Sequence, residues 1–299
     1  MLHIPLLRFG TPYKSVDVAT TPHHRTREPF VEMSQANVGL ISRDLLKQHE
    51  ARAALQRFTV AELVEMCRAA APIFLEETLP VGDAAQTPQD YLEQLNATTG
   101  MPFVMGTRNM GRVAAVLENL ESILRGLTRG LDFGVLDRGY GDVNGGAVSF
   151  FPRAQALGVV LPNNSPGVHG LWLPAIALKT PLVVRPGSAE PWTPYRLIQA
   201  LMKAGVPREA FCFYPSGHAG AGEIVRSTGR SMFFGDVSAV GTVAGAPRVG
   251  LHGPGYSKLF IGRDRIAHWK DYIDLIAASV VENGGRSCVN ASGVWVPSH

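Results

Sequence analysis

Short apolar runs alternate with helical patterns between residues 156 and 262, and this alternation constrains the fold more than any other feature of the chain. Strands that are apolar throughout belong to parallel sheets that helices cover on both faces. We therefore predict an α/β fold with a doubly wound parallel sheet, in which ligands bind at the carboxyl ends of the strands. The predicted strands are Leu157–Leu161, Leu182–Val184, Ala210–Tyr214, Ser231–Phe234 and Lys258–Ile261.

Three segments precede the predicted sheet. Residues 1–35 are rich in Pro, Thr, His and Arg without a sustained period, which predicts an extended N-terminal arm. Residues 36–137 carry helical apolar stripes, the clearest from Asn109 to Leu127, and Thr87 is a good N-cap for a further helix. Residues 138–156 place glycines among aromatic and β-branched residues, which predicts a projecting β-hairpin.

Composition argues against several classes of protein. The 28 Lys and Arg against 25 Asp and Glu give a net charge of +3 without a run of one sign, so neither nucleic acid nor a membrane is an expected partner. No apolar stretch reaches the roughly 20 residues of a membrane span, and the N-terminus lacks a secretory signal pattern. The three cysteines suit a reducing compartment and the histidines lack metal-ligand spacing, so we expect a cytoplasmic protein without a metal site.

Chemically distinctive loops follow four of the predicted strands. Each loop alone is an ordinary turn, but the carboxyl ends of parallel strands meet at one edge of a sheet. We therefore expect these loops to share one ligand site. They are Pro162-Asn163-Asn164, Arg185-Pro186-Gly187, Tyr214-Pro215-Ser216 and Gly235-Asp236.

Cys288 follows a glycine-rich stretch at the end of the predicted helix Trp269–Glu282. A thiolate attacks carbonyl carbon well, and a partly exposed polar setting favours the thiolate. The alternative is a buried cysteine with a packing role, which we expect for Cys67 on its apolar helix face. The motif by itself leaves both interpretations open for Cys288.

Together these motifs resemble those of the aldehyde dehydrogenase superfamily, in the same order and over most of residues 90–299. Leu161 to Pro166 resembles the Pro-Trp-Asn-Phe-Pro motif, and Val184 to Gly187 the Lys-Pro loop that binds the adenosine ribose. Phe234 to Gly241 resembles the Phe-Thr-Gly-Ser-Thr-x-x-Gly turn. Gly284 to Cys288 resembles the Gly-Gln-x-Cys nucleophile motif, and the hairpin 138–156 occupies the place of the oligomerisation arm.

The resemblance implies a division of the chain and a set of site residues. Residues 36–137 and the core 157–262 would form an NAD(P)-binding domain, and residues 263–299 would begin the catalytic domain. The implied cofactor is NAD or NADP, the substrate a small aldehyde, and the full-length protein a homo-oligomer. The implied cofactor-binding residues are Pro162, Arg185, Gly187, Glu190, Gly235 and Gly241, and the implied catalytic residues are Cys288, Asn164 and His252.

In this interpretation Cys288 attacks the aldehyde to form a thiohemiacetal, which is oxidised to a thioester. The Asn164 amide and the backbone N–H of Cys288 would hold the oxyanion. The sequence departs from the family pattern at Arg185, which replaces Lys, and at Asp236, which replaces Ser. Hydrolytic members of the family carry a Glu at the position of His252. His252 is therefore either the base for deacylation or a surface histidine. The acyl group would pass to water or, in the alternative, to CoA.

The chain ends shortly after Cys288, where family members continue, so we expect a truncated chain with an incomplete catalytic domain.

Two further functions stay open. A non-catalytic subunit would bind the cofactor without turnover. A cysteine hydrolase would pair Cys288 with His252 or His299, although no third orienting residue is evident.

Overall fold

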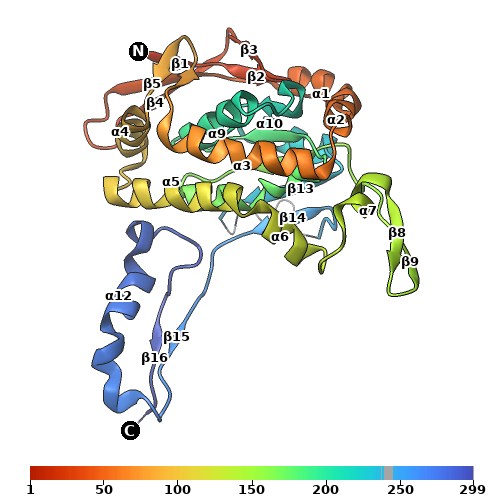
Figure 1. Ribbon diagram of the computed structural model, residues 1–299. Coiled ribbons are helices and arrows are strands. Elements are labelled where there is room, and N and C mark those ends of the chain that lie inside the picture. The colour runs from red at the N-terminus through yellow and green to blue at the C-terminus, as the bar shows by residue number, and fades with distance from the viewer. Residues whose placement is uncertain (237, 239–244, 299) are drawn as a thin grey trace.

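A computed structural model describes residues 1–236, 238 and 245–298 (Figure 1). In this described part the central sheet has seven strands in the order β14-β13-β10-β11-β12-β2-β3. Neighbours among β10 to β14 are parallel, which confirms the predicted doubly wound α/β sheet. Its parallel strands are β10 (Leu157–Val160), β11 (Leu182–Arg185), β12 (Phe211–Phe213), β13 (Arg230–Phe234) and β14 (Val249–His252).

The strand order reverses between β10 and β13. From β10 the chain builds outward through β11 to β12, then returns to place β13 and β14 on the other side of β10. Adjacent loops diverge at such a switch point and leave a crevice outside the carboxyl ends of the strands. This crevice is where the fold places a ligand.

One predicted strand does not belong to this sheet. Lys258–Ile261 was expected to be its last strand, but β15 (Leu259–Phe260) pairs with β16 (Val294–Trp295) in a separate two-stranded sheet. The last parallel strand is β14, which has no apolar run to predict it because only two of its four residues, Val249 and Leu251, are apolar, separated by a glycine and followed by a histidine. Strand β14 ends at His252 and places it beside Phe234 of β13.

The N-terminal arm is extended, as predicted, but it also takes part in sheets. Strand β2 (Leu6–Arg8) pairs antiparallel with β12 at the edge of the central sheet, and β3 (Thr11–Tyr13) pairs antiparallel with β2. Strands β1 (Leu2–Ile4), β4 (Val18–Pro22) and β5 (Pro29–Ser34) form a second sheet. The arm is therefore part of the folded body.

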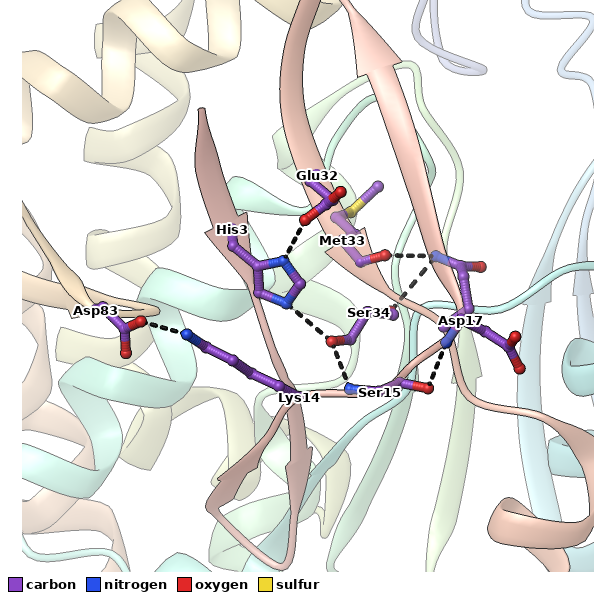
Figure 2. Close-up of polar contacts among 9 residues, drawn as sticks. His3, Lys14, Ser15, Asp17, Glu32, Met33, Ser34 and Asp83 are labelled. Atoms are coloured by element: carbon purple, nitrogen blue, oxygen red, sulfur yellow. Dashed lines mark hydrogen bonds and ion pairs between the residues drawn. The ribbon is translucent and has the colours of Figure 1, made fainter.

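A chain of hydrogen bonds joins β1 to β5 (Figure 2). His3 lies between them, with Nδ1 2.8 Å from Oε2 of Glu32 and Nε2 2.9 Å from Oγ of Ser34. Because the carboxylate only accepts, Nδ1 carries the proton, and Nε2 shares the second hydrogen bond with the Ser34 hydroxyl. The arrangement has the order of a serine–histidine–acid relay, but Ser34 is 0% exposed and its Oγ also accepts from the N–H of Ser15. The bonds join strands within the N-terminal arm, and the buried Ser34 hydroxyl is not accessible to a ligand.

Several helices begin after a residue whose side chain caps them. Helix α4 starts after Thr87, whose Oγ1 accepts from the N–H of Asp90, while the Asp90 carboxylate accepts from the N–H of Thr87. The predicted helix from Asn109 to Leu127 divides at Asn119 into α5 and α6.

The α-helices before the central strands are α1 (Val38–Leu45), α2 (Gln48–Gln56), α3 (Val60–Glu76), α4 (Pro88–Thr99), α5 (Phe103–Glu118), α6 (Leu120–Leu127) and α7 (Phe133–Arg138). The later α-helices are α8 (Pro174–Ala177), α9 (Trp192–Lys203), α10 (His218–Ser227) and α12 (Ile273–Val281).

The sheet buries a hydrophobic core on each face. Side chains alternate along β11, so Leu182 and Val184 pack into the core formed with α3, α5, α8 and α9, whereas Val183 packs against α1 and α10. Burying both faces explains why the strands are apolar throughout. Cys67 lies in the larger core, which confirms its predicted packing role.

Two segments project from this body in Figure 1. Strands β8 (Tyr140–Val143) and β9 (Gly146–Ser149) form the predicted hairpin, and its turn has positive φ angles of 53° at Asn144 and 80° at Gly145, as a type I′ turn requires. The second segment carries β15, α12 and β16. Within the described residues, the helices are all too short or too polar to span a bilayer.

Candidate active site

A cavity of about 520 Å³ opens at the switch point, within the size range of small-molecule sites. It is lined by the loops after β10, β13 and β14, by Arg185 at the end of β11 and by the turn that carries Cys288. Of the four loops predicted to share a site, Tyr214-Pro215-Ser216 after β12 does not line it. Six residues predicted to act together line this one cavity. They are Pro162, Asn164, Arg185, Gly235, His252 and Cys288.

Cys288 is exposed, whereas Cys67 and Cys212 are buried. Burial raises the pKa of the Cys67 thiol to about 12 and that of Cys212 to about 11. Both buried thiols therefore stay protonated near neutral pH. Of the three thiols, only that of Cys288 is accessible to a ligand in the cavity.

Gly255 packs directly against the backbone of Cys288. A Cβ atom at position 255 would overlap the carbonyl oxygen of Cys288. The Gly-Pro-Gly sequence after β14 therefore lets the 253–255 turn approach the cysteine closely, and both turns line the cavity.

Asn164 is tied to the cysteine turn. Its Nδ2 donates to the carbonyl oxygen of Arg286 at 2.9 Å, and its Oδ1 is buried without a hydrogen-bond partner among the described residues. An amide carries two N–H donors, so one remains for another acceptor. The buried, unpaired Oδ1 is in turn an acceptor available to a bound donor.

His252 lies at the carboxyl end of β14 with its ring stacked on Phe234, the ring centroids 4.4 Å apart and the planes 14° from parallel. Burial lowers the pKa of the imidazole from 6.5. The side chain is therefore neutral at pH 7, the form in which a ring nitrogen can accept a proton. The interpretation of His252 as a surface histidine in a turn does not describe this half-buried position.

Arg185 is the last residue of β11, and its Nε donates to the carbonyl oxygen of Ser216 at 3.0 Å. Burial lowers the pKa of the guanidinium from 12.5, but the group remains charged near neutral pH. Within the described ranges its side chain has no carboxylate partner, so its charge is available to an anionic ligand at the cavity.

Two predicted cofactor residues lie outside the cavity lining. The Glu190 carboxylate is buried and accepts from Nε2 of His169, from the N–H of Thr193 and from Oγ1 of Thr193. These hydrogen bonds occupy the Glu190 carboxylate at the start of α9, so Glu190 stabilises the fold there. Gly187 allows the loops after β10 and β11 to approach, because a Cβ would overlap Pro162. Gly241 lies outside the described residues.

Sequence reasoning missed several residues that support the cysteine turn. Arg286 donates to the carbonyl oxygens of Thr99 and Gly100 at the end of α4, and Asn283 and Asn290 hydrogen-bond to Ser287. Asn283 could have been suspected from its place in an Asn-Gly-Gly sequence, which is typical of left-handed backbone. Asn109, which donates a hydrogen bond from α5 to the Asn283 side chain, carries no local signal.

No protein-family model and no curated protein sequence matches the chain. Solved structures of aldehyde dehydrogenases do match it. The enzyme from Brucella melitensis biovar abortus 2308 has a TM-score of 0.79 at 16% identity, over 99% of this chain and 60% of that chain. The NAD-dependent aldehyde dehydrogenase from Sinorhizobium meliloti has a TM-score of 0.74 at 19% identity, over 99% of this chain and 58% of that chain.

An NADP-dependent enzyme from E. coli is also similar, with a TM-score of 0.77 at 17% identity, over 99% of this chain and 60% of that chain. The chain thus spans about 60% of the length of these structures. At these identities the likeness concerns the fold. The chain therefore has the aldehyde dehydrogenase fold, with the cavity at its switch point and an exposed cysteine in the cavity wall.

Proposed function

We propose that this chain forms the cofactor site and the nucleophile of an NAD(P)-dependent aldehyde dehydrogenase. The observation that carries the proposal is the single cavity at the switch point, which contains the exposed Cys288 together with Asn164, Arg185 and His252. A thiol beside amide donors, a cation and a neutral imidazole suits covalent chemistry at a carbonyl carbon.

The residues present fit a dinucleotide. Its anionic groups need a cation, which Arg185 supplies at the cavity wall, and Gly235 has no side chain to keep a ligand from the backbone there. Two of the structures with this fold are named as NAD- and NADP-dependent enzymes. We propose that Pro162, Arg185 and Gly235 contact the cofactor. A bound nicotinamide would supply the acceptor for the hydride that leaves the substrate carbon.

Cys288 would act as a thiolate that adds to the aldehyde carbonyl and forms a C–S bond, which gives a thiohemiacetal. The free Asn164 N–H and the N–H of Cys288 would hold the oxygen as negative charge develops on it. Loss of hydride from the thiohemiacetal carbon and of the hydroxyl proton leaves a thioester on Cys288. The thioester is then cleaved by an acceptor that takes the acyl group.

The acceptor is water in our preferred version, with His252 as the base that removes its proton. The neutral imidazole at the cavity wall supports this role. The sequence around Cys288 also resembles the hydrolytic nucleophile motif more than the acylating one. In the alternative version, favoured by the Gly-Pro-Gly sequence after His252, CoA takes the acyl group and His252 has no chemical role.

Two measurements on the purified protein test the proposal. Calorimetric titration with NAD and NADP should show binding of at least one, and Cys288→Ala should retain this binding while dehydrogenase turnover disappears. Turnover by Cys288→Ala would refute the nucleophile. Binding without turnover by the unmodified protein would favour a non-catalytic cofactor-binding subunit, and binding of neither cofactor would count against the site.

The acceptor is decided by the fate of the thioester. If water is the acceptor, His252→Ala should accumulate an acyl adduct on Cys288 that intact-mass spectrometry detects. Activity should also fall as the pH drops through the lowered pKa of His252, because protonation removes the base. If CoA is the acceptor, the unmodified protein should accumulate the adduct until CoA is added, and His252→Ala should change little.

A further inference from the structure

A chain of side-chain hydrogen bonds runs from helix α5 to the residue before Cys288. Asn109 on α5 donates from Nδ2 to Oδ1 of Asn283 at 2.6 Å, across 174 positions of sequence. Asn283 then donates from its own Nδ2 to Oγ of Ser287 at 2.9 Å. The cysteine turn is thereby connected to a helix that packs against α3.

Asn283 begins a run of unusual backbone. Its φ is 54°, and those of Gly284 and Gly285 are 68° and 74°. Asparagine adopts the left-handed region at lower cost than most residues, but this conformation persists only where surrounding contacts hold it. Asn283 is buried, and its side-chain amide is bonded at both ends.

The other end of the connection is firmly placed. Asn109 is 0% exposed, and its Nδ2 also donates to the carbonyl oxygen of Met105 one turn earlier in α5. Ser287 is held through its backbone as well, because its N–H donates to Oδ1 of Asn290 at 2.7 Å. Both the side chain and the backbone N–H of the residue preceding Cys288 are therefore fixed.

We propose that Asn109 and Asn283 are positioning residues that orient Cys288 through Ser287. This inference rests on the proposed function, since it concerns the nucleophile of that reaction. Neither asparagine lines the cavity, so neither touches the substrate. They act by holding the turn in the one geometry from which the thiol reaches the substrate carbon, and an error of about 1 Å in such placement can lower a rate roughly 100-fold.

The test compares Asn283→Gly with the matched variant Asn144→Gly. Glycine keeps the positive φ at either position, so Asn283→Gly removes the two side-chain bonds without straining the backbone. Asn144 has a φ of 53° and also precedes a glycine, but it lies in the exposed hairpin turn. We expect Asn283→Gly to lower kcat about 10-fold to 100-fold with the KM for the cofactor within about twofold, and Asn144→Gly to change neither.

Asn109→Ala tests the connection from its other end, with Asn119→Ala as its control. Asn119 follows α5 and makes the same bond to the carbonyl oxygen four residues earlier, but it is exposed and lies away from the cysteine turn. Asn109→Ala should lower kcat to a similar extent. The double variant with Asn283→Gly should be no slower than the slower single variant, because both remove one connection.

Thiol counting separates positioning from unfolding. A variant that keeps its fold exposes only Cys288 to a thiol reagent, whereas an unfolded one also exposes Cys67 and Cys212. Full kcat in Asn283→Gly, or additive losses in the double variant, would overturn the proposal. Turnover that survives Cys288→Ala would instead refute the proposed function itself, so the two failures are distinguishable.

Discussion

Asn164 and Arg286 lie 122 positions apart in sequence, yet Nδ2 of Asn164 donates to the carbonyl oxygen of Arg286 at 2.9 Å. The bond connects the loop after the central strand β10 to the turn that carries Cys288. Because the bond runs to a carbonyl two residues before the cysteine, it sets the distance between the amide and the thiol. The proposed oxyanion donor and the proposed nucleophile are thus held as one unit.

The folded protein should present one reactive thiol. Cys288 is exposed, whereas Cys67 and Cys212 are buried, with pKa values raised by burial. Titration with a chromogenic disulfide at pH 8 should release one equivalent rapidly, and Cys288→Ser should remove it. Three equivalents should react after denaturation. Rapid reaction of two or more thiols in the native protein would contradict the described burial.

Gly255→Ala should displace the cysteine turn. The added Cβ would overlap the carbonyl oxygen of Cys288, and backbone at both sites has to move to relieve the contact. We expect a loss of turnover of about 100-fold. Gly222→Ala is the control, since Gly222 lies in α10 with open space around it and alanine favours a helix. Equal activity of the two variants would show that the contact does not constrain Cys288.

Glu190→Gln should destabilise the fold without weakening cofactor binding. Nε1 of Trp172 donates to Nδ1 of His169, which leaves Nε2 of His169 to donate to Glu190. The glutamine amide has only one oxygen, so it can accept from Thr193 or from His169 but not from both. One buried donor therefore loses its hydrogen bond, at a cost of about 1–3 kcal/mol. Chemical denaturation measures this loss, with the exposed Glu65→Gln as control. A large rise in the Kd for the cofactor, with stability unchanged, would instead support a role for Glu190 in cofactor binding.

The cap of α4 should make stability depend on pH. Hydrogen bonds from the Thr87 side chain, and then from its backbone N–H, lower the pKa of Asp90 below its usual value of 3.8. The lowered pKa means that the stabilisation is complete above the unfolded value and is lost as the pH falls through the folded value. Asp90→Ala should therefore cost about 1 kcal/mol at pH 7 and less below about pH 4. A cost independent of pH would exclude this ionised cap.

Much of the fold follows from patterns within short stretches of sequence. The apolar runs at residues 157–161 and 182–184 and the Thr87 cap act through neighbours a few positions away, so periodicity and capping chemistry predict them. The parallel sheet and the motifs at its strand ends were accessible for this reason. The sequence also placed Pro162, Asn164, Arg185, Gly235, His252 and Cys288 among the site residues, and the structure brings them to one cavity.

Other features were decided by contacts between distant segments. Which short run becomes the last strand, β14 or β15, depends on the neighbour available for pairing, and both runs are too short to carry a reliable local signal. Glu190 follows a strand end as a ligand residue would, but packing turns its carboxylate toward His169. The bond from Asn109 to Asn283 exists only once α5 lies beside the cysteine turn. Local sequence determines the elements and their chemistry, whereas burial of both sheet faces determines which distant side chains meet.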